Sequence, residues 1–557
     1  MRGRSAIRFS IPRIRLFLKF ILGVLIISLS ITALLLSITL FLLRERFSQL
    51  NLRDSTANGD DGFLCKRHGD NWFYRYSYFP FFSRNHRNNN KIRMQLCDFF
   101  STVSNLLRHE KSSTWNLTSK SLIIIRSVLL LQRSELYLKI LLLKKCETNV
   151  SDIRLQLDSP KSTATLQQID LKQILCPAIK HIESDSCPWD WAPGCAWSSF
   201  IATAKLDFVP NHILLSFNNH AVGLHLEPSH NIENLSFAVC TQPLYWLVHR
   251  YSRRADRYID WLQVIEFIEI WSSQGVNHFF FYFYTISQLV MDVLQYYEAK
   301  GTVTLLPWRS FPVGENENPN RDVYRLAHSL ANNDCLWRSQ GAHFVAFVDL
   351  DEYILTTSGV PLIVFIEKKA ELCPRCGSFA AVHRKMYYSS SRPQNDFRWH
   401  DVRFDWLTNV GYGLPEIEGP HKQIVRPETV SIISTHSTRK SYPGYIDVNL
   451  NSSEIVLLHA SYKWSETNHS MNNVIILPQL FVDVLASLNS AYHEIGQLLF
   501  KNKTMRIDRI LQMKIAKCIS RWHINKCKSV DLCKAGIVGQ TGWIYAENIS
   551  TNEYQLT

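Results

Sequence analysis

The sequence has 557 residues and a formal net charge of +13, with 46% hydrophobic and 20% charged residues. This length allows a large hydrophobic core and two or more domains. Six of the basic residues precede residue 20, which leaves +7 on the rest of the chain. Because no long basic run occurs there, the charge does not support a nucleic-acid partner.

The N-terminal region predicts a membrane anchor. Residues 20–43 contain no charged side chain, and as a helix they would extend about 36 Å, enough to span a bilayer. Six basic residues and no acidic residue precede this span, so we expect a cytosolic tail at 1–19 and the remainder on the far side. The alternative is a cleaved signal peptide, but the span is long for one and no clear cleavage site follows.

Glycosylation signals and cysteines agree with an exported chain. All seven Asn-x-Ser/Thr sequons lie beyond the span, and twelve of the thirteen cysteines lie from Cys97 onward. We therefore expect mainly disulfides, with at least one free or intermolecular thiol because the count is odd. Cys373 and Cys376 are also compatible with half a zinc site or a redox pair, although no second Cys/His pair lies nearby. The sequons begin at Asn116, Asn149, Asn234, Asn451, Asn468, Asn502 and Asn548.

The segment after the span divides into a stem and an accessory region. Residues 44–110 are rich in Arg, Asn, Asp and Ser and are interpreted as a stem. Two apolar runs at 122–131 and 136–143 predict strands, so 111–230 is interpreted as a β-rich accessory region. At the other end, 481–557 is expected to be a helical extension that contains cysteines.

Between these regions, residues 231–480 show an α/β pattern. Short apolar runs alternate with helix-like segments, and glycines at 275 and 301 end two of the helices. Alternation of this kind predicts βαβ units and a parallel sheet. The expected strands are 237–240, 278–284, 303–308 and 344–348, and the expected helices are 258–274, 289–300 and 322–338.

An acidic triplet follows the last of these strands. Asp349 and Asp351 are expected to point the same way, with Leu350 opposite, because side chains alternate along a strand. Two carboxylates at the carboxyl end of a parallel strand could hold Mg²⁺ or Mn²⁺ and bridge it to a diphosphate. The plainer alternative is a solvated loop end, which is what most acidic clusters are.

Other catalytic patterns are missing from the sequence. It has no Gly-x-Ser-x-Gly elbow, no P-loop and no His-Glu-x-x-His. The glycines at 411 and 413 form only part of a dinucleotide fingerprint and are interpreted as a loop.

Five segments, in order, resemble glycosyltransferase family 92. The first is the helix-plus-strand segment 261–282. The others read NDCL at 333–336, VDLDE at 348–352, HKQIVRP at 421–427 and LLHASY at 457–462. The resemblance covers roughly 235–465, and the ordered set is far more specific than any one segment.

The resemblance implies a GT-A-type, Rossmann-like domain that uses a UDP-sugar and a divalent metal, usually Mn²⁺. It further implies an inverting galactosyltransferase, anchored in the Golgi membrane as a type II protein, with a glycan or glycoprotein acceptor. By position, Asp349 and Asp351 would hold the metal and the donor's ribose or diphosphate. His459 would close the site as a further metal ligand. Lys422 would lie near the donor, and Lys422 or Arg426 could assist catalysis as a fixed cation.

Further site residues are less determined by the sequence. Cys240 and Thr241, at the end of the first strand, are candidates for contact with the donor nucleotide. Inversion requires a base that takes a proton from the acceptor hydroxyl. Glu416 is the chosen candidate, and Glu418, Asp396 and Asp405 remain open.

Two competing functions remain open at this point. A non-catalytic relative could bind glycans or nucleotide sugars through the same fold. A metal phosphoesterase could use the same carboxylates, but the further His and Asp ligands of a two-metal site are missing.

Overall fold

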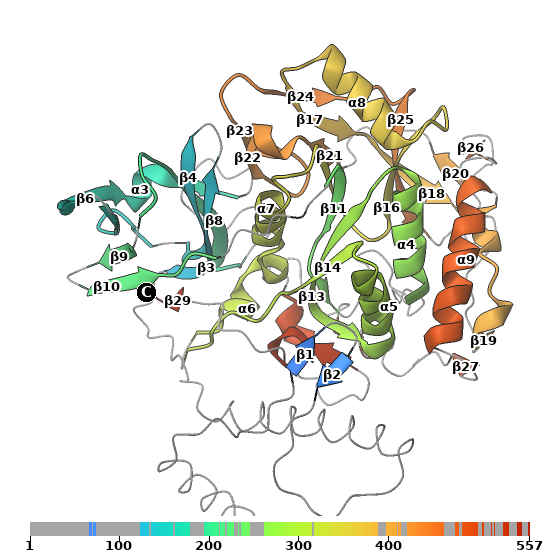
Figure 1. The fold of residues 1–557 in the computed structure, drawn as a ribbon, viewed down its shortest axis with the longest axis horizontal. Helices are drawn as coiled ribbons and strands as arrows, with labels where there is room; N and C mark the ends of the chain where they lie inside the picture. The colour runs from blue at the N-terminus through green and yellow to red at the C-terminus, as the bar shows by residue number, and fades with distance from the viewer. Residues whose placement is uncertain are drawn as a thin grey trace, which may run out of the picture. The chain divides into compact units, whose positions relative to one another are not determined.

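The structure is a computed structural model that describes residues 66–68 and 71–73 and most of 123–556 (Figure 1). The longer gaps within 123–556 are 179–193, 246–260, 388–396, 414–419, 462–473, 506–513, 519–526, 534–542 and 549–554. Two compact units are distinguished, 1–112 and 113–557. Within the first unit, the described part is a hairpin of β1 (Lys66–His68) and β2 (Asn71–Phe73).

The predicted span at 20–43 lies outside the described residues. Among the helices that the structure describes, none is long and apolar enough to cross a membrane.

The second unit is built around a mixed sheet with a parallel core. Its four main parallel strands lie in the order β14-β13-β11-β15, so the first strand in the chain lies between the second and the fourth. The sheet continues through β21, antiparallel to β15, to β17 and β24. The prediction of a parallel βαβ sheet is thus confirmed for its first half. The strands are β11 (Phe237–Thr241), β13 (His278–Ser287), β14 (Val303–Pro307), β15 (Phe344–Val348), β17 (Cys376–Ala381), β21 (Lys422–Val425) and β24 (Ile446–Asn449).

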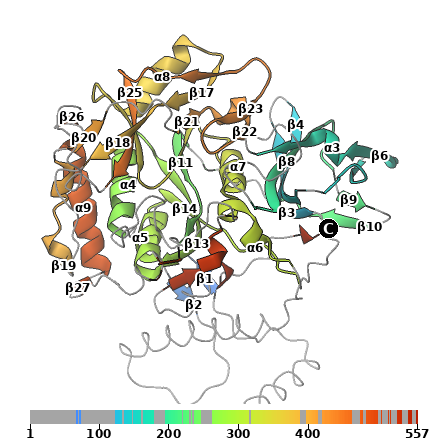
Figure 2. The same ribbon diagram turned by 180° about the vertical axis from the view of Figure 1, so that it is seen from behind.

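Helices cover both faces of this sheet (Figures 1 and 2). Alternate residues of β13 enter two different cores: Phe279, Phe281 and Phe283 pack with α4 (Trp261–Ser273) and α5 (Gln288–Ala299). Phe280, Tyr282 and Tyr284 pack with α7 (His328–Arg338) on the other face. A strand buried on both faces is apolar throughout, which is why 278–284 was recognisable from the sequence.

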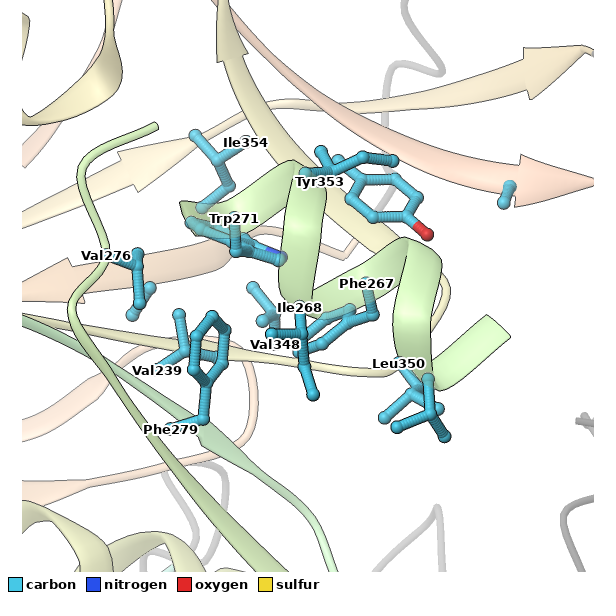
Figure 3. Packing of buried hydrophobic residues seen from close by; sticks show 14 of the residues in the cluster. Val239, Phe267, Ile268, Trp271, Val276, Phe279, Val348, Leu350, Tyr353 and Ile354 are labelled. Carbon is cyan, nitrogen blue, oxygen red and sulfur yellow. The ribbon is translucent and has the colours of Figure 1, made fainter. Parts of the chain in front are cut away.

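Helix α4 packs tightly on the sheet, as Figure 3 shows for Phe267, Ile268 and Trp271 against Val239, Phe279 and Val348. Ten of its thirteen residues are buried. The helix stops at Gly275, whose φ of +93° suits glycine. A Cβ at Gly275 would also lie 2.2 Å from Ile363, so the close approach of α8 (Leu362–Leu372) requires glycine here.

Two predicted elements differ in the structure. The single helix expected at 322–338 is wrong: α6 (Pro319–Asp322) and α7 are separate, and between them Arg325, Leu326 and Ala327 all have positive φ. Left-handed backbone interrupts a helix, and it is held here by Trp308 Nε1, which donates to the Leu326 carbonyl at 2.8 Å.

The loop expected around Gly411 and Gly413 is also wrong, because these residues form strand β20 (Val410–Gly413). It belongs to a second sheet with the order β16-β25-β18-β20-β26. Helix α9 (Val482–Leu499) covers α4, where Tyr492 stacks on Trp261 with ring centres 5.5 Å apart. The other strands are β16 (Glu352–Thr356), β18 (His383–Tyr387), β25 (Ile455–Ser461) and β26 (Val474–Leu477).

The accessory region consists of two antiparallel sheets around a common core. The predicted runs at 122–131 and 136–143 are confirmed as β3 (Ile123–Gln132) and β4 (Leu136–Lys145). Together with β8 (Trp197–Leu206), these strands send their other face into the core around α7. The second sheet has the order β10-β9-β5-β6, with β5 (Arg154–Ser159), β6 (Ser162–Asp170), β9 (Ile213–Phe217) and β10 (His220–Leu224).

Disulfides fasten several of these parts. Cys373 and Cys376 are bonded to each other, so the interpretation as a disulfide is confirmed for this pair. Cys176 is a free thiol within the described part of the chain. The other disulfides printed for described residues are Cys195–Cys527, Cys240–Cys335 and Cys518–Cys533.

Candidate functional site

The acidic triplet lies in a sharp turn. Strand β15 ends at Val348 and β16 begins at Glu352, so Asp349 and Asp351 lie in the turn between them. The expectation that Asp349 and Asp351 lie on a strand is therefore wrong, and strand alternation does not set their directions. The turn leaves the side chain of Asp349 29% exposed and that of Asp351 only 4% exposed, and it gives each carboxylate a different basic partner. Leu350 is buried in the core below α4.

Asp349 is held by Lys422. The Lys422 Nζ lies 3.1 Å from Asp349 Oδ2 and 3.1 Å from Glu352 Oε2, and the lysine is 1% exposed. Glu352 Oε2 also accepts a hydrogen bond from the backbone N–H of Asp349 at 2.8 Å. Burial alone would lower the pKa of Lys422, but the two carboxylates outweigh it and hold that pKa above its usual value. Lys422 therefore stays charged and fixes both carboxylates.

Asp351 is held by His459. Strand pairing places His459 opposite Glu352, and its Nε2 lies 3.0 Å from Asp351 Oδ2. The other ring nitrogen, Nδ1, lies 2.9 Å from His383 Nε2. Burial opposes protonation of His459, yet Asp351 raises its pKa to about 9. The imidazole is thus oriented from both sides.

The end of β11 adjoins the triplet. Thr241 pairs in register with Val348, so the ends of β11 and β15 lie side by side. The chain leaves β11 for β13 in one direction and returns to β15 on the other side, which makes this a topological switch point. The sulfur of Cys240 is bonded to Cys335, and the Thr241 hydroxyl donates to the Phe280 carbonyl at 3.3 Å. Their side chains are therefore already engaged.

Two further histidines lie near Asp349 and Lys422. His328, the first residue of α7, lies with its Nε2 2.8 Å from Thr435 Oγ1, and His436 Nδ1 lies 3.2 Å from the His421 carbonyl. Burial lowers the pKa of each to about 3. Both are therefore neutral at physiological pH, and the cations that act on them are Lys422 and Arg325.

Of the four predicted bases, only Asp405 lies within the described residues. Glu416, Glu418 and Asp396 lie outside the described residues. Asp405 is described, and it is exposed on a short 3-10 helix, Asp405–Leu407. Arg426, considered as a second cation, instead bonds Glu428 and the Pro374 carbonyl.

Sequence reasoning missed Glu352 and His383 as members of the site. Glu352 stood next to the triplet, but its role depends on Lys422, which is 70 residues away in sequence. His383 has no motif around it, and only the pairing of β18 with β25 brings it to His459. Glu266 is buried on α4, where it accepts hydrogen bonds from Tyr353 and Trp406. Glu266 is thus part of a buried polar network.

The oxygen and nitrogen atoms of Asp351 and His459 are candidate ligands for a metal ion. Within the described residues, no group of three or more His, Cys, Asp and Glu side chains is arranged to hold an ion. However, Mg²⁺-type ions often bind one or two carboxylates and complete their shell with water and substrate phosphates. The 3.0 Å between Asp351 Oδ2 and His459 Nε2 equals the spacing of neighbouring ligands about 2.1 Å from an octahedral ion. His459 is also oriented through its second nitrogen, as metal-bound histidines are. The residues therefore fit such an ion.

Comparison with known proteins identifies this domain. The family model described as glycosyltransferase family 92 matches residues 236–480. A Caenorhabditis elegans protein named as a glycosyltransferase family 92 protein is 28% identical over 166 residues, which are 29% of this chain and 30% of that relative. The match thus spans less than a third of the relative's length. Residues 236–480, which carry the parallel strands, the acidic triplet, Lys422 and His459, belong to glycosyltransferase family 92.

Proposed function

We propose that this protein transfers a hexose, galactose in the first instance, from a UDP-sugar to a glycan acceptor, with inversion and with a divalent metal. The observation that carries the proposal is the placement of Asp349 and Asp351 at the switch point between β11 and β15. Nucleotides bind outside the carboxyl ends of the strands at such a point in open α/β sheets. The strand order and this placement support a GT-A-type domain.

The donor nucleotide would lie across the ends of β11 and β15. Because the side chains of Cys240 and Thr241 are engaged, their contribution would come from the backbone. Asp349 keeps 29% of its side chain exposed, so it is the carboxylate best able to accept a hydrogen bond from a ribose hydroxyl.

Asp351 and His459 would hold the metal, with Asp349 beside them. When bound, such an ion neutralises the charge that develops on the leaving diphosphate. Because His459 carries a proton at neutral pH, it must release that proton to become a ligand. His383 keeps the ring of His459 in place during this change.

Lys422 acts as a positioning residue. It is too buried to contact a diphosphate, but it holds Asp349 and Glu352 in fixed places. A preorganised site of this kind does not have to rearrange during the reaction, which is the main source of electrostatic catalysis. For the base that accepts the acceptor's proton, Glu416 remains the proposed residue, and Glu418, Asp396 and Asp405 are the alternatives.

The cellular setting is proposed from the sequence. The uncharged stretch at 20–43, preceded by six basic residues, supports a type II anchor with the catalytic domain in the Golgi lumen. Four disulfides between described residues agree with an oxidising compartment.

Thermal shift of the purified full-length chain tests the donor site. Ligands that bind the folded state raise the melting temperature with their concentration relative to Kd. We expect UDP and UDP-galactose to raise it only when Mn²⁺ is present, and we expect galactose transfer to a glycan acceptor under the same conditions. No shift with any nucleotide, in a folded protein, would overturn the proposal. Nucleotide binding without transfer to any acceptor would instead favour the non-catalytic alternative.

A further inference from the structure

Arg384 lies on the strand next to His459 but faces away from it. Side chains alternate along β18, and His383 contacts His459 from one face. Arg384 therefore lies on the opposite face, the one shared by Met386 and its cross-strand neighbour Tyr412 on β20. This face belongs to the second sheet, not to the sheet that carries the switch point.

Two of the three guanidinium nitrogens of Arg384 are buried without a hydrogen-bond partner. The residue is 6% exposed, and neither its Nε nor its Nη1 makes a hydrogen bond. Burial lowers the pKa of this guanidinium, and the neighbour that opposes the shift is the phenol of Tyr412. Arginine stays protonated even so, and a buried charge without a partner is costly. Other buried cations of the described chain differ, since Lys422 and Arg338 have carboxylates and Lys139 has hydroxyls and a carbonyl.

Tyr412 supplies a second donor at the same place. It is 7% exposed. Its hydroxyl can donate as well as accept, so it adds a donor to the guanidinium fork on one face of two paired strands. Such a site is complementary to a planar oxyanion, because the fork of arginine matches the two oxygens of a carboxylate.

We propose that Arg384, together with the Tyr412 hydroxyl, binds the carboxylate of an acidic sugar in the glycan acceptor. This inference rests on the proposed transferase function. The donor is expected at the switch point of the other sheet, whereas Arg384 lies on the far face of β18 from His459. The recognised carboxylate would therefore belong to a sugar other than the one that receives the hexose.

Melting temperatures of the full-length chain with glucuronate and with glucose test the proposal. Glucose is the matched neutral sugar, and Arg403→Gln is the matched control because Arg403 is an exposed arginine. We expect glucuronate, and not glucose, to stabilise the wild type and Arg403→Gln. Arg384→Gln should bind glucuronate roughly tenfold more weakly or worse, since hydrogen bonds to charged groups are the strong ones. Arg384→Lys should retain part of the effect, because it keeps the charge but loses the fork.

The unliganded variants give a second readout. If the guanidinium is unpaired in the free protein, Arg384→Gln should melt no lower than the wild type, because a desolvated charge has been removed. A marked loss of stability in Arg384→Gln would mean that a group of the protein pairs with it, and would overturn the proposal. An equal glucuronate shift in the wild type and Arg384→Gln, or none in the wild type, would overturn it as well.

A UDP arm separates the acceptor site from the donor site. With Mn²⁺, UDP should stabilise Arg384→Gln as much as the wild type. Loss of the UDP shift in Arg384→Gln would place Arg384 in the donor site and overturn its assignment to the acceptor. If no nucleotide shifts the melting temperature but glucuronate does so in an Arg384-dependent way, the carboxylate site is supported. In that case only the transferase function is contradicted.

Discussion

Lys422 in the glycosyltransferase domain and Lys139 in the accessory sheet are both buried, but their charges are met in different ways. Lys422 contacts the carboxylates of Asp349 and Glu352. Lys139 is 0% exposed and donates to Thr203 Oγ1, Ser431 Oγ and the Ser431 carbonyl, and it lies over the rings of Trp337 and Tyr442. The charge of Lys422 is balanced by carboxylates. The hydrogen bonds of Lys139 to described residues go to uncharged groups.

This difference distinguishes a candidate catalytic site from a structural contact between two regions. Around Lys422, three carboxylates and His459 gather at the end of a parallel strand, and Asp349 stays partly exposed. That arrangement keeps acidic oxygens available to a ligand. Around Lys139, the hydrogen bonds to described residues go to hydroxyls and a carbonyl, and one of them connects β4 to Ser431 of the glycosyltransferase domain. The comparison predicts that removing either lysine destabilises the fold, but only changes near Lys422 affect chemistry.

The largest effect is expected from Asp351→Asn. The substitution keeps the shape of the side chain and removes the charge that faces His459, so sugar transfer should fall by about 10²–10³-fold or more. Transfer assays at saturating donor measure the loss, and circular dichroism checks the fold. Asp170→Asn serves as the control, because Asp170 is a half-exposed partner of Arg154 in the accessory region. A folded Asp351→Asn protein with wild-type transfer would sink the proposed role of the triplet.

The next effect concerns Lys422→Met. It leaves the buried Glu352 beside the partly exposed Asp349 without a cation, and breaking a buried pair typically costs about 3–5 kcal/mol of unfolding free energy. Urea denaturation of the full-length chain measures this loss. If the free energy of unfolding changes by less than that of Lys139→Met, Lys422 does not hold the two carboxylates in the way described.

Lys139→Met should have a smaller effect, about 1–2 kcal/mol, because hydroxyl and carbonyl partners are left unsatisfied but no charge is. Methionine retains much of the side chain's contact with Trp337 and Tyr442. Transfer per folded molecule should equal that of the wild type. A large loss of transfer at normal stability would show that the accessory sheet acts on the catalytic site and would break the distinction between the two lysines.

Much of this fold was predictable because its signals are local. The strand His278–Ser287 is apolar on both faces, and Gly275 and Gly301 mark the ends of α4 and α5. The break at Arg325, Leu326 and Ala327 was not predictable, since none of these residues favours positive φ. It depends on a tertiary contact, the hydrogen bond from Trp308.

The site residues also divide into those with a local sequence signal and those that depend on tertiary contacts. Asp349 and Asp351 could be found because they follow an apolar strand, but their directions depend on the turn and not on strand alternation. The roles of Lys422 and His383 depend on which distant strands pair, and one sequence does not reveal that. Arg384 is the extreme case, because only the structure shows that its Nε and Nη1 make no hydrogen bond.

The smallest effect is expected from Glu269→Gln. It measures how much a buried carboxylate lowers the stability of the fold when it has no lysine such as Lys422 beside it. Burial raises the pKa of Glu269, although Tyr297 donates to its Oε1 at 2.7 Å and Lys300 also opposes the shift. A raised carboxyl pKa favours the folded state fully below the unfolded value near 4.5, and that advantage is lost as pH rises through the higher folded value. Glutamine keeps an acceptor for Tyr297 and never ionises. The melting temperature of Glu269→Gln should therefore exceed that of the wild type at pH 7 and match it near pH 4. A variant that is less stable than the wild type at pH 7 would mean that the protein compensates the charge of Glu269. Glu269 would then not differ from the carboxylates that Lys422 contacts.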